Sequence, residues 1–457
     1  MKYAPPPGPR SLPVIGNLHE FLREPLEYLA GLVRSYGDVV TFKLGLQPAV
    51  LINDPAVVDK LIRDTRFERS DSARRSVAAL TGAGLLTLEG AQHRRHRRLI
   101  SPALHRDRIK RYVAIMAEET YRVLDAWPSG EERDLSMVVR QLTLDIVARS
   151  LFNTEQASQA SLIDATFKRL RGRLLRSSMM ARMLPFRVPL LIGRPARDAR
   201  ALQGFIAQLV RERRAQRDDP DDLLTMLLAA RDEDGGALSD EEIGAECLTM
   251  LLAGHATAAQ TLTWAWHLLT QNPDVQAALS EEVRRELGDR PITFDDLARL
   301  PLTERVVRET LRLYPATWFH DRACAQPAEL AGYYIPAGTV VAFSNWLLHR
   351  DPRSFAEPER FDPDRFLPER AAAIRDGSYL PFGAGVHSCI GTSFALAELR
   401  VILAAMAQRF QVRAVPRFPV EARPGITLAM RHPFAVVATL RRAEPAARVS
   451  APARSPG

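Results

Sequence analysis

The sequence predicts a mainly α-helical fold with small β-sheets. Apolar residues recur at helical spacing over residues 108–151 and again over residues 156–172. A third stretch, residues 238–271, is expected to form one unusually long helix. The predicted strands are short and cover residues 38–44, residues 49–52 and two stretches within residues 333–343.

The long helix has a defined start and end. Ser239 and Glu242 stand three residues apart, as in a capping box, and Asn272 followed by Pro273 marks the end. A helix of this length is roughly 50 Å long, at about 1.5 Å per residue, and can cross a whole domain. Gly254 lies in its middle, where glycine costs about 1 kcal/mol relative to alanine, so either close packing or a functional reason is expected.

The composition is that of a globular chain without a membrane anchor. Charged residues are 25% of the 457 residues and hydrophobic residues are 46%, while the formal net charge is +8. A basic chain can bind nucleic acid, an anionic membrane or an acidic protein. No nucleic-acid motif is present and the N-terminus has no apolar run, so we expect no nucleic-acid binding, no transmembrane anchor and an acidic protein partner.

Three cysteines, Cys247, Cys324 and Cys389, are widely spaced and form no C-x-x-C pair. This pattern indicates a reducing compartment, and we expect the protein to be cytoplasmic. Cys389 lies near the end of a glycine-rich loop, residues 381–391, and an apolar helical stretch follows. The positive N-terminal end of that helix would help to hold the sulfur as a thiolate metal ligand. The alternative is a buried structural cysteine beside a turn.

The loop carries a recognisable signature. Phe382, Gly385, Cys389 and Gly391 fit the pattern F-x-x-G-x-x-x-C-x-G, and the chain thereby resembles the cytochrome P-450 superfamily. The resemblance implies a haem-thiolate fold in which haem b lies between the long central helix and the cysteine loop. Cys389 would be the axial ligand to iron, and His387 would contact a haem propionate.

Other propionate contacts are implied at His93, Arg97 and Arg322. His93 and Arg97 are four residues apart, so they share one face of a predicted helix. The remaining arginines of residues 90–100 would face solvent on the thiolate side, where an acidic ferredoxin or flavodoxin could dock. Without the resemblance, such a cluster would be taken for a solvated or nucleic-acid-facing surface.

The long helix contains a segment similar to the oxygen-binding motif of the superfamily. Ala253 and Gly254 would let the helix pass over the haem, and Thr257 would orient water and protons. The motif departs from the family at Ala256, because an acid is expected there and alanine cannot deliver a proton. Water, His255 or Glu246 could replace the acid, although His255 is expected to point to the wrong face; otherwise the enzyme could use peroxide.

A structural ion cluster is also implied. Glu309 and Arg312 form the E-x-x-R motif, which in isolation would be an ordinary surface pair. The family locks this pair to a second arginine, for which Arg360 and Arg365 are candidates, and the sequence frame favours Arg365.

The resemblance also implies an apolar substrate pocket. A loop at residues 80–86 would cover it, and residues 179–186 would form a mobile roof, although these residues could also be a helix connection or a membrane contact. The pocket candidates are Leu85, Ala316, Thr317, Trp318, Ile426 and Thr427.

The implied function is that of a soluble bacterial-type monooxygenase. It would insert one atom of O2 into a hydrophobic small molecule, with electrons from NAD(P)H through a separate reductase chain, because no flavin or iron-sulfur segment is fused. Residues 1–441 would form one monomeric haem domain, followed by a disordered tail at residues 442–457. The alternatives are a peroxide-driven enzyme and a haem-binding protein without turnover. Fatty acid, terpenoid and macrolide substrates remain equally open.

Overall fold

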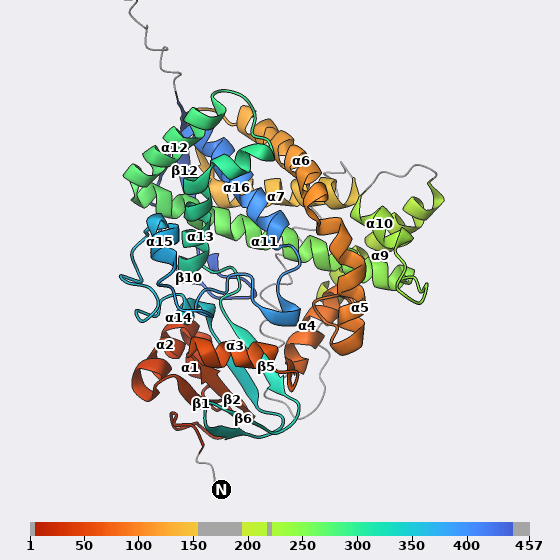
Figure 1. The fold of residues 1–457 in the computed structure, drawn as a ribbon, viewed down its shortest axis with the longest axis vertical. Coiled ribbons are helices and arrows are strands. Elements are labelled where there is room, and N and C mark those ends of the chain that lie inside the picture. Colours follow the sequence, from red (N-terminus) through yellow and green to blue (C-terminus); the bar gives the residue numbers. More distant parts are fainter. Residues whose placement is uncertain (1–4, 154–193, 217–221, 442–457) are drawn as a thin grey trace, which may run out of the picture.

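The computed structural model describes residues 5–153, 194–216 and 222–441, and these form a mainly helical fold with small sheets, as predicted. The largest sheet and the first helices gather at one end, and the long helices fill the other, with strand β12 (Ala435–Leu440) beside them (Figure 1). The helices of the first hundred residues are α1 (Leu18–Arg23), α2 (Pro25–Tyr36), α3 (Pro55–Arg63), α4 (Asp71–Thr81) and α5 (Gly90–Ile100).

The later helices build the larger end of the molecule. They are α6 (Arg106–Asp125), α7 (Leu135–Phe152), α9 (Arg194–Ala215), α10 (Leu223–Ala229), α11 (Asp240–Gln271), α12 (Pro273–Leu287), α13 (Pro301–Leu313), α14 (Asn345–Leu348), α15 (Pro368–Ala371) and α16 (Thr392–Arg409). Short 3-10 turns are η1 (Ser101–Leu104), η2 (Asp295–Arg299), η3 (Pro363–Phe366) and η4 (Gly385–His387).

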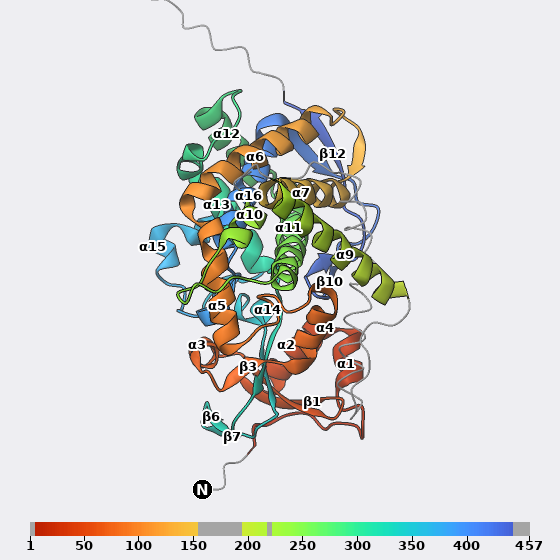
Figure 2. The same ribbon diagram turned by 90° about the vertical axis from the view of Figure 1, so that its right-hand side faces the viewer.

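Helix α11 is the central element, and it crosses the molecule between the other long helices (Figures 1 and 2). Its capping box is present, since the Glu242 N–H donates to Oγ of Ser239 at 3.2 Å and the Ser239 N–H donates to Oε2 of Glu242 at 2.8 Å. Most of its residues are buried, as expected of a helix inside a core, but Ala253 in its middle is exposed and Gly254, Ala256 and Thr257 are half-buried.

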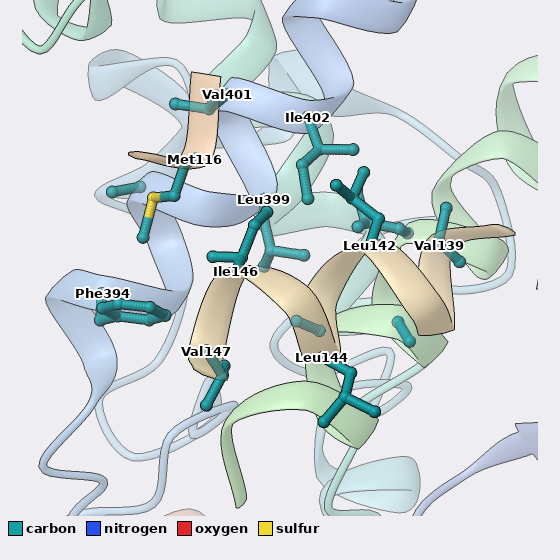
Figure 3. Close-up of a cluster of buried hydrophobic side chains, with 14 of the residues drawn as sticks. Met116, Val139, Leu142, Leu144, Ile146, Val147, Phe394, Leu399, Val401 and Ile402 are labelled. Carbon is teal, nitrogen blue, oxygen red and sulfur yellow. The ribbon is translucent and has the colours of Figure 1, made fainter. Parts of the chain in front are cut away.

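The main core lies where α7 and α16 pack against α11, and α6 packs against α7 and α16 in turn. Met116 of α6 and Ile146 of α7 meet Leu399 and Ile402 of α16 in a continuous apolar cluster (Figure 3). This packing fixes the start of α16, and therefore the loop that carries Cys389, relative to the central helix.

The largest sheet has the strand order β1-β2-β8-β5-β3, in which only β2 and β8 run parallel. Its strands are β1 (Val39–Leu44), β2 (Gln47–Ile52), β3 (Phe67–Arg69), β5 (His320–Cys324) and β8 (Val340–Phe343). The smaller sheets contain β4 (Glu132–Asp134), β6 (Ala328–Leu330), β7 (Tyr333–Ile335), β9 (Phe410–Ala414), β10 (Ala422–Arg423), β11 (Ala429–Met430) and β12 (Ala435–Leu440). The hairpin β1–β2 was predicted; β7 and β8 form as strands, but they belong to separate sheets.

Two boundaries differ from the sequence-based expectation. Residues 80 and 81 end helix α4, so the irregular loop begins only at Gly82, whose φ of 81° terminates the helix. The helical pattern of residues 108–151 is divided into α6 and α7 by a turn and the short strand β4. Pro128 in that turn cannot continue a helix.

Three expectations fall outside the described residues: the helix at 156–172, the pocket roof at 179–186 and the tail at 442–457. Of the helices that the structure does describe, none combines the length and apolar character needed to cross a bilayer.

Candidate active site

The cysteine loop holds Cys389 by its backbone, and the sulfur forms no disulfide. The Cys389 N–H donates to the Phe382 carbonyl oxygen at 2.8 Å, and the Ser388 N–H donates to that of Gly385 at 3.1 Å. Oγ1 of Thr392, at the start of α16, donates to the Cys389 carbonyl oxygen at 2.9 Å. Among the three cysteines, Cys389 alone is exposed, whereas Cys247 and Cys324 are buried.

Gly385 lets this loop lie directly on helix α3. Its φ of 68° is in the left-handed region, and an added Cβ would lie only 2.8 Å from Cγ2 of Ile62. A larger residue would push the loop away from α3 and move the cysteine.

The protein around Cys389 does not ionise the thiol by itself. Burial raises the pKa of the Cys389 thiol, while the Gly391 N–H and the Thr392 side chain act in the opposite direction. The end of α16 therefore helps to stabilise a thiolate but is not sufficient. A thiol that coordinates a metal cation is deprotonated outright, so this sulfur suits a metal-bound state.

Arg97 connects helix α5 to the cysteine loop. Its Nη1 donates to the Ser388 carbonyl oxygen at 2.7 Å, and its Nη2 donates to Oγ of Ser388 at 3.2 Å. Sequence spacing placed Arg97 on the same helix face as His93, and the structure brings both beside the loop.

His93 and His387 form a pair of neutral imidazoles at this edge. Nδ1 of His387 lies 3.3 Å from Nε2 of His93, and Nε2 of His387 lies 2.9 Å from Oε2 of Glu89. Burial, followed by the neighbouring His387, lowers the pKa of His93 to about 4, and burial also lowers the pKa of His387. Each neutral ring has one N–H, and these contacts use both: Nε2–H of His387 faces the Glu89 carboxylate, and Nε2–H of His93 can donate to Nδ1 of His387. A direct contact of either ring with a propionate stays a prediction.

Arg69 was missed in the sequence and proves to be part of this site. It lies directly opposite Arg322 in the antiparallel pair of β3 and β5. Like charges in this position destabilise a sheet. Burial and the charges of Arg322 and Arg97 lower the pKa of Arg69 to about 10, although Glu89, whose Oε1 is 3.9 Å from its Nη1, opposes the shift.

These residues fit a haem. Three guanidinium groups, those of Arg69, Arg97 and Arg322, lie around one edge of the site, and they outnumber the nearby carboxylates of Glu89 and Asp321. The two propionates of a haem would supply the missing negative charge, while Cys389 would supply the iron ligand. Glu89, like Arg69, carries no signal in the sequence, because its role depends on contacts between distant segments.

The oxygen-binding segment lies on α11. The Thr257 hydroxyl donates to the Ala253 carbonyl oxygen at 2.8 Å. Its oxygen can therefore still accept a hydrogen bond from water. A Cβ added to Gly254 would lie 3.0 Å from Cγ2 of Val147 in α7. Close packing against α7 is therefore a sufficient reason for this glycine, and a role toward oxygen stays a prediction.

Neither of the two side chains that could replace the missing acid at Ala256 lies beside Thr257. His255 is buried, with Nδ1 2.7 Å from the Leu251 carbonyl oxygen. Glu246 lies eleven residues before Thr257 and contacts His96 and the backbone of Leu85.

The structure brings the E-x-x-R residues together with Arg365. Nε of Arg312 donates to Oε2 of Glu309 at 2.7 Å, and Nε of Arg365 lies 3.4 Å from Oε1 of Glu309. All three side chains are buried. Arg360, the other candidate, is exposed and pairs with Glu357.

Three of the pocket candidates, Ala316, Ile426 and Thr427, lie in two neighbouring segments. Ala316 and Thr427 are nearly buried in neighbouring segments, joined by a hydrogen bond from the Leu428 N–H to the Ala316 carbonyl oxygen at 3.0 Å. Oγ1 of Thr427 is buried without a partner in the described structure, while Ile426 beside it is half exposed.

Trp318 lies in a core cluster, and its role in lining the pocket stays a prediction. Its ring stacks on Phe21 at 6.4 Å and contacts Phe319, so it fills the core beneath the sheet. Nε1 of Trp318 donates to the Gly425 carbonyl oxygen at 2.9 Å, which supports the turn that carries the other candidates. Leu85 is buried in the main core cluster, and Thr317 is half-buried.

Two of the arginines expected to face a partner are already paired. Nε of Arg95 lies 2.7 Å from Oδ2 of Asp232, and Nη1 of Arg98 pairs with Glu233. Arg94 is exposed, and it forms no ion pair with any residue that the structure describes. The docking surface is therefore less strongly positive than the sequence of α5 suggests.

The fold and the residues around Cys389 together fit a haem protein. The family model "Cytochrome P450" matches residues 6–433, and the chain belongs to this family.

The relatives and a solved structure agree with this assignment. Cyclooctatin synthase from Streptomyces melanosporofaciens is 38% identical over 92% of this chain and 93% of its own length. Cyclooctat-9-en-7-ol 5-monooxygenase from the same organism is 35% identical over 90% of each chain. The crystal structure of the cytochrome P450DA heme domain superposes with a TM-score of 0.85 at 26% identity, and the match covers 96% of this chain and 98% of that one. The chain is thus a haem monooxygenase, an oxidoreductase that uses O2.

Proposed function

We propose that this monooxygenase oxidises a cyclic terpenoid hydrocarbon or alcohol by hydroxylation or epoxidation. Terpenoids were one of three substrate classes left open by the sequence. The name of the relative at 35% identity states oxidation of a cyclic alkenol, and this supports the terpenoid class over fatty acids and macrolides.

The observation that carries the assignment as a haem enzyme is the free sulfur of Cys389 beside a buried cluster of arginines. When bound, the haem supplies activation of O2 for insertion of one oxygen atom into an unactivated bond. Cys389 would coordinate the iron, and Arg69, Arg97 and Arg322 would hold the propionates, with His93 and His387 beside them.

Thr257 orients the water and protons needed at the distal side. Its hydroxyl donates to the Ala253 carbonyl oxygen, so water can donate to the hydroxyl oxygen. Because Ala256 offers no titratable group, protons reach Thr257 through ordered water rather than through an acid on the same helical turn.

Electrons come from NAD(P)H through a separate reductase chain that ends in an acidic ferredoxin or flavodoxin. The net charge of +8 supports an acidic partner, and Arg94 offers an unpaired charge on α5. The enzyme acts as a cytoplasmic monomer in this proposal. Ala256 favours one alternative, a peroxide-driven enzyme; turnover with hydrogen peroxide as fast as with a reductase chain would establish it.

The first experiment tests the ligand. The reduced protein treated with carbon monoxide should show the red-shifted Soret band of a thiolate-ligated haem, and Cys389→Ala should abolish the band. Cys247→Ala and Cys324→Ala, which alter buried cysteines, are the controls and should retain it. A normal band in Cys389→Ala would refute the proposed ligand.

The second experiment tests the substrate class. Ferric protein is titrated with terpenoids, fatty acids and macrolides of similar size, and Soret shifts are recorded. Cyclic terpenoids should bind most tightly, and tighter binding by either other class would reverse the assignment.

A further inference from the structure

A buried ion pair joins helix α5 to helix α11. Nδ1 of His96 lies 2.7 Å from Oε1 of Glu246, and Nε2 of His96 lies 3.3 Å from Oε1 of Glu242. The side chains of His96 and Glu246 are 3% and 0% exposed. A carboxylate faces each ring nitrogen, and only the imidazolium form can donate to both.

The second oxygen of Glu246 binds the loop of residues 82–89. Its Oε2 accepts a hydrogen bond from the Leu85 N–H at 3.1 Å. The same loop lies directly on α11, since a Cβ added to Gly84 would be 2.5 Å from Oγ1 of Thr249. Glu246 links the state of His96 to the position of Leu85, because a buried carboxylate that loses its counter-charge is strongly destabilised, and its movement toward water would break the hydrogen bond to Leu85.

We propose that His96 and Glu246 are positioning residues that hold the loop of residues 82–89 closed over the substrate pocket, and that this closure requires the imidazolium form of His96. This inference rests on the proposed function in one respect, because it takes the loop of residues 82–89 as the segment that covers the substrate pocket. Neither residue touches haem or substrate; each acts through the Leu85 backbone.

The charged groups around His96 come from two helices and the loops beside them. On α5, Arg95 bonds Asp232 and lies 3.5 Å from Glu242, and Arg97 bonds Ser388. On α11, Glu242 and Glu246 face the imidazole. The other charged groups nearby have partners of their own: Arg213 pairs with Asp222 at the start of α10, Glu89 of the loop bonds His387, and Arg69 donates to the Leu85 carbonyl oxygen at 3.0 Å.

These neighbours give the closure a pH dependence. Burial lowers the pKa of His96, but the hydrogen bonds and charges of Glu246 and Glu242 outweigh it, so the pKa lies above the ordinary 6.5. For a histidine whose pKa is raised by folding, the stabilisation is complete below pH 6.5 and is lost as the pH rises through the raised value. The loop should loosen on the alkaline side.

Hydrogen exchange of the Leu85 amide in the haem-loaded protein tests the closure. After correction for intrinsic exchange, protection in the wild type should fall about tenfold or more as the pH rises above 6.5, since a hydrogen bond to a charged group is lost. His96→Gln should show the low protection at every pH. Glu246→Gln keeps an acceptor for the amide and should give a flat, protected profile.

A neutral haem ligand reports the same motion at the pocket. The association rate of phenyl isocyanide with the reduced protein should rise with pH in the wild type and should be high at all pH values in His96→Gln. Glu233→Gln removes an exposed ion pair between α5 and the segment before α11 and serves as the matched control with wild-type behaviour.

Flat wild-type profiles of exchange and association would overturn the inference, even if a variant failed to fold. Failure of the proposed function would be seen separately, as the absence of the thiolate Soret band. If the exchange profile has its pH step but the association rate does not, the loop is held by His96 without covering the pocket, and the inference is wrong in that part.

Discussion

At the scale of single residues, the site contains a few buried charged groups, such as Arg69, whose pKa is set by the neighbouring charges. The residues that local spacing could identify, such as Cys389 and Arg97, lie together in the structure. Arg69 and Glu89 could not be identified, because their roles arise from the pairing of β3 with β5 and from the contact between Glu89 and His387. The role of Trp318 stays a prediction, because an aromatic residue suits either a pocket or a core and the structure shows its core contacts.

We expect Arg69 to slow the loss of haem from the protein. Replacing it with leucine removes a buried cation beside the propionates, and a hydrogen bond to a charged group contributes about 1.5–3 kcal/mol, so haem loss should be at least about tenfold faster. Transfer of haem to excess apomyoglobin measures the rate. Arg66→Leu removes a largely exposed arginine that pairs with Asp64 and is the control. Equal rates of haem loss in the two variants would contradict this role.

Glu398 of α16 should be uncharged in the folded protein. It is fully buried, neither carboxyl oxygen has a hydrogen-bond partner in the described structure, and burial raises its pKa well above 4.5. Because the folded state then binds a proton that the unfolded state releases, this group should lower the free energy of unfolding by up to about 1.4 kcal/mol per pH unit above pH 4.5.

Urea denaturation of the wild type and Glu398→Gln between pH 5 and pH 8 tests this expectation. The free energy of unfolding of the variant should lack the fall with pH that Glu398 causes. The variant should therefore become more stable relative to the wild type as the pH rises. Glu369→Gln, an exposed residue of α15, should leave the profile unchanged. Parallel profiles for the wild type and Glu398→Gln would show that Glu398 is ionised.

At the scale of elements, helix α13 and the turn η3 are joined by a buried ion cluster. Arg312 bonds Glu309 through two nitrogens and also donates to the carbonyl oxygens of His349 and Pro358. The E-x-x-R spacing predicted this pair, because three residues bring both side chains to one helix face. The partners beyond it are backbone groups, which have no sequence pattern, so only the fold reveals them.

Arg312→Lys should destabilise the protein strongly. A lysine cannot reproduce the forked contacts, and disruption of a buried ion pair costs about 3–5 kcal/mol. Chemical denaturation followed by circular dichroism measures the loss. Arg360→Lys, at an exposed ion pair, should stay within about 0.5 kcal/mol of the wild type. A similar midpoint for both variants would contradict a structural role of the cluster.

At the scale of the whole molecule, the fold brings cationic groups from three distant segments to one edge of the haem site. β3 carries Arg69, α5 carries Arg97 and β5 carries Arg322. The sequence predicted the mainly helical class, the long central helix and the hairpin β1–β2, because these depend on local periodicity and capping. It could not predict which sheet each short strand joins, since that is decided by contacts across hundreds of residues.

Haem should therefore stabilise the sheet end of the molecule more than the helical end. A ligand that binds only the folded state adds stability in proportion to the logarithm of its concentration over its dissociation constant. Limited proteolysis of haem-free protein should cut near residues 67–89 first, and haem loading should suppress those cuts. Faster cleavage within α6 or α16 than at these residues would contradict the expectation.

The facing arginines of β3 and β5 also bear on how the protein is made. Arg69 and Arg322 repel each other across the ladder, and the contact of Ser70 with Asp321 and the nearby Glu89 offset this only in part. Without an anion between the arginines, the edge strand should open more readily. In a cell short of haem, newly synthesised chains should accumulate with this edge open, where proteases can recognise them. The supply of cofactor would then set the amount of enzyme as well as its activity.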